Sequence, residues 1–445
     1  MPDMHILILI NSLTSGGAER VTVNLSSYLV EKGYKATVVT IKNEERDFYT
    51  LDRRVARICL DSTQRTLRSN RVMANLKQRM KRLTVLRILG RLSSLRILGR
   101  LFSLRILGRL FSLRVLDRLS LFRTLKSLKP LRKVIKQQQP DIVLGMITSN
   151  AVRAIIASFG LPTKVITSER NFPGRKKTSS RWARFRKRFY RFADGHVVQT
   201  HKISCWLKKH TRASNITIIP NSVTYPIISL SPVLAPQMVV SKESKVILAV
   251  GKLHEQKGFD LLISAFHRIA QHMPGWVLVI LGKDVRTEGQ RQSLQQQIDE
   301  LDLNDKVKMP GCAGNISDWY RRSDIFVLSS RYEGFPNVLL EAMANGCSCI
   351  SSDCDTGPSE IIINEQNGLL IPSEDIDSLA EAMERLVKDE KLRAHIAANA
   401  IKVRENFSEH RIMSMWIKFF EEVLRSDSGI LKNIIGSGKA MYKRR

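Results

Sequence analysis

The sequence predicts an α/β protein built from two doubly wound domains. A chain of 445 residues is long enough to bury two separate cores. Short apolar runs, typical of buried parallel strands, alternate with segments of helical periodicity through most of it. The order strand, helix, strand over residues 5–40 is that of a βαβ unit, which favours a parallel sheet covered on both faces by helices.

The first βαβ unit contains a candidate phosphate-binding turn. A strand at 5–10 leads into Gly16 and Gly17, and the following helix ends at Gly33, which we expect in the left-handed conformation. The next strand is expected at 36–40. Backbone without Cβ atoms can approach a diphosphate closely, and the helix start adds N–H donors. The same pattern also fits a plain tight turn.

Further strands and helices follow in alternation. In the first half we expect strands at 141–146, 164–167, 196–199 and 216–219. A Pro/Ser-rich stretch at 226–244 reads as a linker. In the second half we expect strands at 246–250, 276–282, 307–311 and 324–329, and helices at 287–301, 375–388, 390–405 and 412–424.

The positive charge is concentrated in two segments. The chain has 72 Lys+Arg against 41 Asp+Glu, a formal net charge of +31. Segment 65–136 holds 21 Lys+Arg and the single acid Asp117, and segment 169–191 holds 10 Lys+Arg and the single acid Glu169. Elsewhere the charges nearly balance, so the excess indicates local surfaces for an anionic partner.

Four similar nine-residue units occupy part of the first basic segment, over 86–121. Nine residues make about two and a half helical turns, so successive units face opposite sides and no single apolar stripe forms. We expect a basic helical insertion on an anionic membrane surface, with leucines inserted and arginines reaching lipid phosphates. The alternative is a duplicated piece of an ordinary helix, which is compatible with membrane contact.

The second basic segment continues to residue 192 and interleaves aromatic residues with its cations. The aromatic residues are Trp182, Phe185, Phe189, Tyr190 and Phe192. This mixture suits a lipid headgroup interface, and it would also suit single-stranded nucleic acid. The remaining alternative is an exposed basic helix whose aromatic side faces the core.

Several classes of protein are disfavoured. No run of about 18 apolar residues is present, so a membrane-spanning helix is not expected. The start, Met1 to His5, lacks the basic and apolar regions of a signal peptide. The six cysteines have no C-x-x-C spacing, and no His/Cys set has the spacing of metal ligands. We therefore expect reduced thiols in the cytoplasm, no cofactor and no metal.

Two carboxylates flank a strand-to-helix turn around residues 324–346. Strand 324–329 is followed by Glu333 in the loop, and Glu341 falls about one turn inside the next helix. The helix start offers N–H groups to a phosphate, and a carboxylate on each side could bind the hydroxyls of two sugars. The alternative is a surface and a helix glutamate without a joint role.

This segment resembles the E-x7-E signature of the retaining group 1 (family four) glycosyltransferases, which have the two-domain GT-B fold. Further blocks match in the family's order, at 11–20, 250–258, 357–361 and 367–372. Together the blocks cover most of 4–225 and 245–425, and their combination is far more specific than any one of them.

The resemblance implies two Rossmann-like domains facing across a cleft. The first would bind the acceptor and carry the basic insertion, the second would bind the nucleotide sugar, and a late helix would cross back to the first domain. The expected segments are the N-terminal domain 1–225 with its insertion 65–136, the linker 226–244, the C-terminal domain 245–408, the crossing helix 409–426 and a basic tail 427–445.

The resemblance also implies roles for individual residues. Lys252 and Lys257 would stabilise the departing diphosphate in place of a metal, and Glu333 would contact the donor sugar near its reacting carbon. Glu341 would hold the ribose hydroxyls, and Gly311 would lie beside the base. The other implied donor-binding positions are Gly16, Gly17, Pro336, Asn337, Val338, Ser359 and Glu360.

One block departs from many relatives of this family. Where these carry a histidine in the first domain, this chain has Glu169, Arg170 and Asn171 after a strand. Arginine cannot act as a base at neutral pH, but it can hold a phosphate or donor hydroxyls. We expect these three residues to bind the acceptor, and we leave a catalytic histidine, either His196 or His201, as an open alternative.

The leading interpretation is a retaining, metal-independent glycosyltransferase. It would move a hexose or N-acetylhexosamine from a nucleotide sugar, UDP-linked by family analogy, to a polyprenyl-diphosphate-linked or other membrane-surface glycan. It would act peripherally on the inner face of the cytoplasmic membrane, without a nucleic-acid partner. One alternative is a transferase with a soluble acceptor, which the amphipathic insertion disfavours. The other is a non-catalytic basic protein that binds lipid or nucleic acid on a degenerate transferase fold, which the intact lysines and carboxylates disfavour.

Overall fold

The structure is a computed structural model that describes residues 4–14, 16–45, 47–60, 128–175, 179–284 and 289–426. The nine-residue units, most of the expected insertion and the expected tail lie outside the described residues. The chain forms two compact units, Met1–Val165 and Ile166–Arg445.

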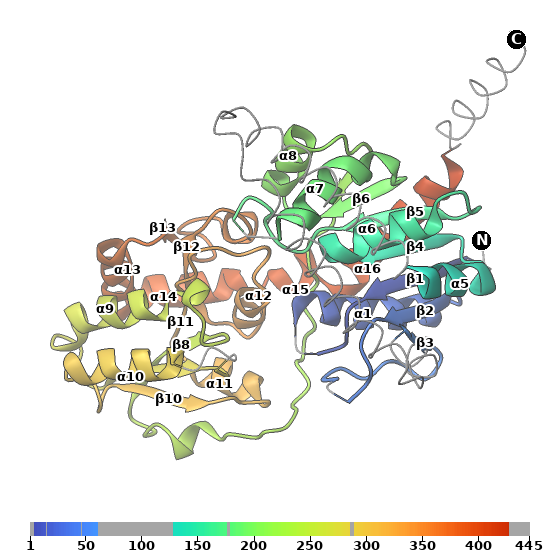
Figure 1. Cartoon of the computed structure of the whole chain (residues 1–445). Coiled ribbons are helices and arrows are strands. Elements are labelled where there is room, and N and C mark those ends of the chain that lie inside the picture. Colours follow the sequence, from blue (N-terminus) through green and yellow to red (C-terminus); the bar gives the residue numbers. More distant parts are fainter. Residues whose placement is uncertain are drawn as a thin grey trace, which may run out of the picture. The chain divides into compact units, whose positions relative to one another are not determined.

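Two parallel sheets form the framework of the α/β fold (Figure 1). The first has the strand order β3-β2-β1-β4-β5-β6-β7, and the second has the order β10-β9-β8-β11-β12-β13. In both sheets the order reverses direction beside the first strand, β1 or β8, as in a doubly wound sheet. The predicted fold class, two Rossmann-like domains, is confirmed.

The first unit begins with the expected βαβ arrangement. Strand β1 is buried along its whole length and pairs in parallel with β2 and β4. Gly33 follows helix α1 with φ +82°, which confirms the expected left-handed position. The elements are β1 (His5–Ile10), α1 (Gly17–Glu31), β2 (Lys35–Thr40), β3 (Ala56–Cys59), α5 (Lys129–Gln138), β4 (Ile142–Met146) and α6 (Ile147–Ser158).

The second unit begins with the remaining strands of the first sheet. Strand β6 is crossed closely by the last described helix, because a Cβ built on Gly195 would lie 2.6 Å from the Phe419 ring. The elements are β5 (Lys164–Ser168), which starts at the unit boundary, α7 (Ser180–Phe189), β6 (Gly195–Val198), α8 (His201–His210), β7 (Ile216–Ile218) and the late helix α16 (Glu409–Arg425).

The second sheet is buried on both faces. Along β8, Val246 and Leu248 pack into one apolar cluster, and Ile247 and Ala249 pack into another on the opposite face. This explains why the strand reads as a continuous apolar run. The strands are β8 (Lys245–Val250), β9 (Trp276–Leu281), β10 (Val307–Gly311), β11 (Ile325–Leu328), β12 (Ser348–Asp353) and β13 (Leu369–Pro372).

Helices and short 3-10 turns (η) connect these strands. The expected helix over 390–405 is two helices, because α14 ends at Ala400 and α15 begins at Val403. Within the described ranges, no helix is both long and apolar enough to span a membrane. The helical elements are η3 (Glu255–Lys257), α9 (Phe259–Ala270), α10 (Gln290–Glu300), α11 (Ile316–Arg322), α12 (Asn337–Ala344), η4 (Pro358–Glu360), α13 (Ile376–Lys388), α14 (Glu390–Ala400) and α15 (Val403–Asn406).

Candidate active site

An ion pair between a part-buried lysine and a buried glutamate joins two of the predicted site residues. The Lys257 Nζ atom lies 2.6 Å from Glu333 Oε1, which also accepts a hydrogen bond from Ser330 Oγ at 2.7 Å. Lys257 ends the η3 turn after β8, and Glu333 lies in the loop from β11 to α12. Glu333 is 8% exposed. A carboxylate at this depth needs a cation and hydrogen-bond donors, and it has both.

Hydrogen bonds donated by side chains fix the loop that carries Glu333. On one side, Gln256 Nε2 donates to the carbonyl oxygen of Tyr332 at 2.8 Å. On the other, Thr356 Oγ1 donates to the carbonyl oxygen of Glu333 at 2.6 Å. Arg331, two residues before Glu333, donates to both carboxylate oxygens of Asp260. The Glu333 side chain is therefore presented from a loop held by contacts on both flanks.

Two glycines allow the close approaches that the loop requires. Gly258 has φ +62°, and a Cβ built on it would lie 2.2 Å from the carbonyl oxygen of Ser329. Gly357 has φ +101°, and its built Cβ would lie 2.7 Å from Pro336 Cδ. At both positions the backbone has a positive φ and there is no room for a Cβ atom. Any other residue would therefore force neighbouring atoms to move. This gives a physical reason for glycine in the 250–258 and 357–361 blocks.

Helix α12 begins next to this pair. Its N-cap is Pro336, whose side chain can donate no capping bond and accept none. The first N–H groups of the helix therefore have no side-chain cap and could donate to an anion. Glu341 lies one turn inside, 6% exposed, and accepts a hydrogen bond from Tyr320 OH at 3.1 Å. The strand, loop and helix order predicted for this segment is confirmed.

The block at 169–171 lies against the same loop. A Cβ built on Gly334 would lie 2.8 Å from the Arg170 carbonyl oxygen and 3.0 Å from Asn171 Cα. The Arg170 side chain is buried and donates from Nη2 to Asn221 Oδ1. Burial lowers the pKa of Arg170 to about 9. The side chain of the neighbouring Glu169 contacts other residues. Its Oε1 atom accepts a hydrogen bond from Tyr190 OH at 2.5 Å and lies 3.7 Å from Arg186 Nη1.

The other predicted donor-binding residues have varied surroundings. Lys252 is exposed, and Gly311 ends β10 with φ +107°. Ser359 is exposed on η4. Glu360 Oε1 accepts a hydrogen bond at 2.7 Å from the backbone N–H of His201, at the start of α8.

Gly16 and Gly17 belong to the first unit, where Gly16 is the N-cap of α1 with an extended backbone. A Cβ built on Gly16 would lie 2.3 Å from a carboxylate oxygen of Glu19 in the first turn of the helix. The turn at the start of α1 therefore packs tightly on its own first helical turn.

The two candidate histidines differ in their environments. His196 is fully buried on β6, 2.7 Å from Thr167 Oγ1 and stacked on the Tyr190 ring. Burial lowers the pKa of His196 to about 4. His201 is exposed at the first position of α8. The contacts of His196 are those of a neutral core residue.

One acidic residue near the site is paired with cations. Asp353 is the last residue of β12, and Asp355, two positions later, pairs with Arg175 and, at 3.5 Å, with Lys202. Among the described residues, no group of three or more His, Cys, Asp or Glu side chains could hold a metal ion.

Three residues of this neighbourhood are absent from the sequence-based prediction. Asn221 joins Arg170 to Asn337, Gln199 donates to Asn221 at 2.9 Å, and Tyr320 holds Glu341. Asn221 follows Pro220 after β7, and Gln199 is the residue after β6. For Gln199 the available signal was a polar residue directly after a buried parallel strand, since ligands of such folds bind at the carboxyl ends of strands.

Comparison with known proteins places these features in a family. A family model described as "Glycosyl transferases group 1" matches residues 234–403, and one described as "Glycosyltransferase Family 4" matches residues 99–224. An uncharacterized glycosyltransferase of Methanocaldococcus jannaschii is 28% identical over 339 residues, which cover 65% of this chain and 82% of the relative.

Two further proteins extend the comparison. A Campylobacter jejuni enzyme, named as an α-1,4-N-acetyl-D-galactosaminyltransferase acting on a GalNAc-containing glycan linked to undecaprenol diphosphate, is 25% identical over 67% of this chain and 79% of its own. The structure of HepE from Anabaena, solved in complex with UDP, aligns with a TM-score of 0.68 at 17% identity, covering 94% of this chain and 100% of that one. With two parallel-sheet domains in place and both models matched in chain order, this chain belongs to the group 1 glycosyltransferases of GT-B fold.

Proposed function

We propose that this glycosyltransferase is retaining and metal-independent, and that it moves a hexose or N-acetylhexosamine from a UDP-sugar to a polyprenyl-diphosphate-linked glycan. The observation that carries the proposal is the buried Lys257–Glu333 pair beside the start of α12. It sets a cation, a carboxylate and helix N–H groups around one short loop, which is what the transfer of a sugar from a diphosphate requires.

The reaction breaks the bond between the anomeric carbon and a diphosphate oxygen. Negative charge develops on the departing diphosphate, and Lys257 with the first N–H groups of α12 would stabilise it. Glu333, fixed by Lys257 and Ser330, would hold a donor-sugar hydroxyl near the anomeric carbon. The acceptor hydroxyl attacks the face that the diphosphate leaves, and its proton passes to a phosphate oxygen of the leaving group. Glu341, oriented by Tyr320, would bind the ribose.

The choice of donor and acceptor rests on the relatives. HepE was solved with UDP, and the Campylobacter enzyme is named for a glycan on undecaprenol diphosphate. The chain itself adds an exposed basic surface on α7, where Arg181, Arg184, Lys187 and Arg188 are all exposed. A membrane that carries anionic lipids and a lipid-linked diphosphate would attract this surface, which supports a peripheral position on the membrane.

A donor screen tests the proposal. Purified protein is incubated with UDP- and GDP-linked hexoses and N-acetylhexosamines, with bacterial membrane extract as acceptor, and released nucleoside diphosphate is measured. We expect release with a UDP-sugar that depends on the lipid fraction, and a product whose anomeric configuration matches that of the donor by NMR. Release that needs only water-soluble glycans would favour a soluble acceptor. No release and no calorimetric binding of UDP would indicate a non-catalytic binding protein.

A further inference from the structure

Arg170 carries a buried charge whose partners do not neutralise it. The residue is 6% exposed. In the described part of the chain, its one hydrogen-bond acceptor is the neutral Asn221 Oδ1, and its Nε and Nη1 atoms are buried without partners. Buried polar groups without partners are rare in native proteins, and a buried cation without a counter-ion is rarer still.

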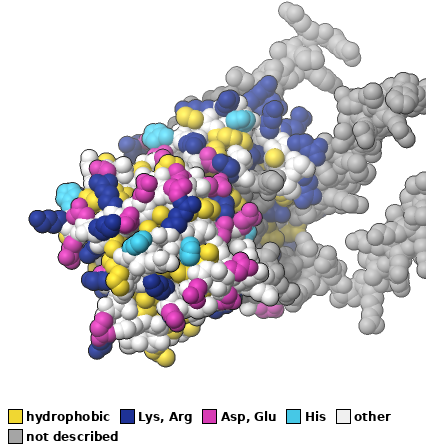
Figure 2. Space-filling model, turned by 90° about the vertical axis from the view of Figure 1, so that its left-hand side faces the viewer, with side chains coloured by type: hydrophobic (Ala, Val, Ile, Leu, Met, Phe, Trp, Pro, Cys, Tyr) yellow, Lys and Arg dark blue, Asp and Glu magenta, His cyan; other side chains and the backbone are white. Residues whose placement is uncertain are grey.

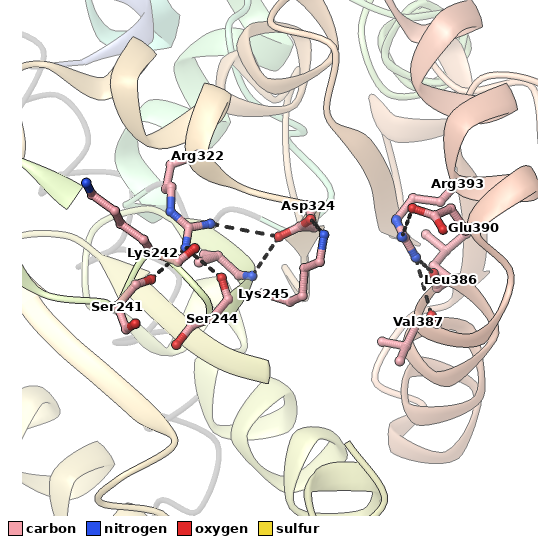
Figure 3. Close-up of polar contacts among 11 residues, drawn as sticks. Ser241, Lys242, Ser244, Lys245, Arg322, Asp324, Leu386, Val387, Glu390 and Arg393 are labelled. Carbon is pink, nitrogen blue, oxygen red and sulfur yellow. Dashed lines mark hydrogen bonds and ion pairs between the residues drawn. The ribbon is translucent and has the colours of Figure 1, made fainter. Parts of the chain in front are cut away.

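Two other arginines of the same unit show the ordinary arrangement (Figure 3). Arg322 donates to the carbonyl oxygens of Ser244 and Ser241 at 2.6 and 2.8 Å, with Asp324 4.0 Å away. Arg393 donates to a carbonyl oxygen at 2.6 Å and lies 3.3 Å from Glu390. Both are more exposed than Arg170, yet each has several acceptors and a carboxylate. The lack of a counter-ion at Arg170 is therefore a local feature and not a general property of this fold.

The Asn221 side chain is fully engaged, and its orientation is fixed. Its Oδ1 accepts from Arg170 and from Gln199 Nε2, and its Nδ2 donates to Asn337 Oδ1 at 2.6 Å and to the Phe335 carbonyl oxygen at 3.4 Å. A flipped amide would set donor against donor. An uncharged amide thus fills the position where a carboxylate would neutralise Arg170, and it links Arg170 to the first residue of α12.

Further unsatisfied polar atoms gather around this arginine. Ser168 Oγ and Gln199 Oε1 are also buried without hydrogen-bond partners. Gln199 Oε1 would lie 3.1 Å from a Cβ built on Gly334, the neighbour of Glu333. The unsatisfied Gln199 Oε1 therefore borders the loop that carries Glu333.

We propose that Asn221 leaves Arg170 without a counter-ion so that the guanidinium pairs with a substrate phosphate beside the start of α12. This inference rests on the function proposed above and identifies a second cation of the same site, besides Lys257. The phosphate belongs either to the nucleotide donor or to the lipid-linked acceptor, since both carry a diphosphate.

The decisive variant is Asn221→Asp, which supplies the missing counter-ion. The new carboxylate would pair with Arg170, and the Asn337 amide, once flipped, would donate to the second carboxylate oxygen in place of the lost Asn221 donor. We therefore expect the Tm to rise by about 2–4 °C. The same change occupies the guanidinium and adds negative charge, so binding of the phosphate should weaken about tenfold or more. A rise in Tm together with a loss of affinity is not what a structural asparagine would give, because its replacement would lower the Tm.

Three companion variants complete the test. Arg170→Gln should weaken phosphate binding to the same degree, and Arg170→Lys should retain part of it. Arg393→Gln is the matched control, because it removes an arginine with structural partners and should lower Tm without changing the affinity of the folded protein. Titration of UDP by calorimetry measures the donor arm, and the KM for the lipid-linked acceptor at saturating donor measures the acceptor arm.

The outcomes separate cleanly. The inference is supported if Asn221→Asp and Arg170→Gln both weaken UDP binding or both raise the KM for the lipid-linked acceptor, and if Asn221→Asp also raises the Tm. Which of the two quantities changes tells which diphosphate is bound. Unchanged values in both arms, or a lowered Tm for Asn221→Asp, overturn it. If wild-type protein fails the donor screen, the proposed function fails instead, and inorganic pyrophosphate binding with the Tm comparison still decides the role of Arg170.

Discussion

The Lys257–Glu333 pair and the Arg385–Glu365 pair join a cation and a carboxylate over nearly the same distance, 2.6 and 2.7 Å, in different surroundings. The side chains of the first pair are 18% and 9% exposed, and those of the second 48% and 56%. Arg385 of the second pair belongs to α13. The face of the molecule that carries α9, α10 and α13 shows acidic and basic side chains intermixed (Figure 2). Water and neighbouring charges screen that pair. A short distance between a cation and a carboxylate therefore does not by itself indicate an active site. The burial of the two side chains and their other hydrogen bonds distinguish the two pairs.

The largest expected effect separates the two glutamates. Glu333→Gln removes a buried charge that we propose to lie beside the reacting carbon, so kcat should fall about a hundredfold or more. Glu365→Gln makes the same chemical change at the exposed pair, and its kcat should equal that of wild-type protein. Both are measured as nucleoside diphosphate released under saturating substrate. Near-normal turnover of Glu333→Gln would remove this residue from the proposed mechanism.

The contrast between burial and exposure also predicts a pH dependence. Because burial lowers the pKa of His196 to about 4, the unfolded state takes up a proton below its ordinary pKa of about 6.5 while the folded state does not. The free energy of unfolding should therefore decrease as pH falls from about 6.5 to 4, by up to about 3 kcal/mol from this residue.

Urea unfolding of three proteins over this pH range isolates the contribution of His196. The variant His196→Asn should show a smaller decrease than wild-type protein, and the exposed control His395→Asn should match wild-type protein. Equal slopes for wild-type protein and His196→Asn would show that this histidine is not the group responsible.

The cation of the buried pair should matter less than its carboxylate, but more than a surface lysine. Lys257→Ala removes a charge-assisted bond to Glu333 and the proposed contact with the leaving diphosphate, so kcat/KM should fall about thirtyfold. Lys388 forms an exposed pair with Glu384 at 2.5 Å, and Lys388→Ala should leave kcat/KM unchanged. A similar result for both lysines would contradict the distinction drawn here.

The smallest effect concerns the surface of α7. This helix carries only basic charged residues, whereas α13 carries both signs. The double variant Arg184→Gln/Arg188→Gln should weaken binding to phosphatidylglycerol vesicles about tenfold, since two exposed cations together contribute on the order of 1–2 kcal/mol. Binding to phosphatidylcholine vesicles should not change, and Arg385→Gln/Lys388→Gln on α13 should behave like wild-type protein. Deletion of 84–121 measures the separate contribution of the nine-residue units by flotation.

The loop around Glu333 could be predicted because all of its features lie in one short segment. An apolar strand, a Gly-Phe-Pro-Asn turn and a helical face follow each other over 324–346, and each depends on neighbours in the sequence. The buried runs of the second sheet were predictable for the same reason. The division of the helix over 390–405 was not, since its helical periodicity continues through the break between Ala400 and Val403.

The polar contacts between distant segments could not be predicted. Arg170 and Asn221 are 51 positions apart, and Asn221 and Asn337 are 116 apart. Local periodicity contains no information on such pairs. The sequence indicated that Arg170 could hold a phosphate. That Arg170 has no counter-ion among the described residues could be learned only from the structure, which shows the contacts of its side chain. The same holds for Lys257 and Glu333, which are 76 positions apart and whose pairing followed only from a resemblance that assigns both to one site.

The most direct test of the account is a double-mutant cycle on Lys257 and Glu333. If the two side chains act as one unit on a single transition state, their effects on kcat/KM are not additive. We predict that the double variant Lys257→Ala/Glu333→Gln transfers sugar within about threefold of the rate of Glu333→Gln alone. A double variant whose loss equals the product of the two single losses would show that the residues act independently, and would contradict the central claim.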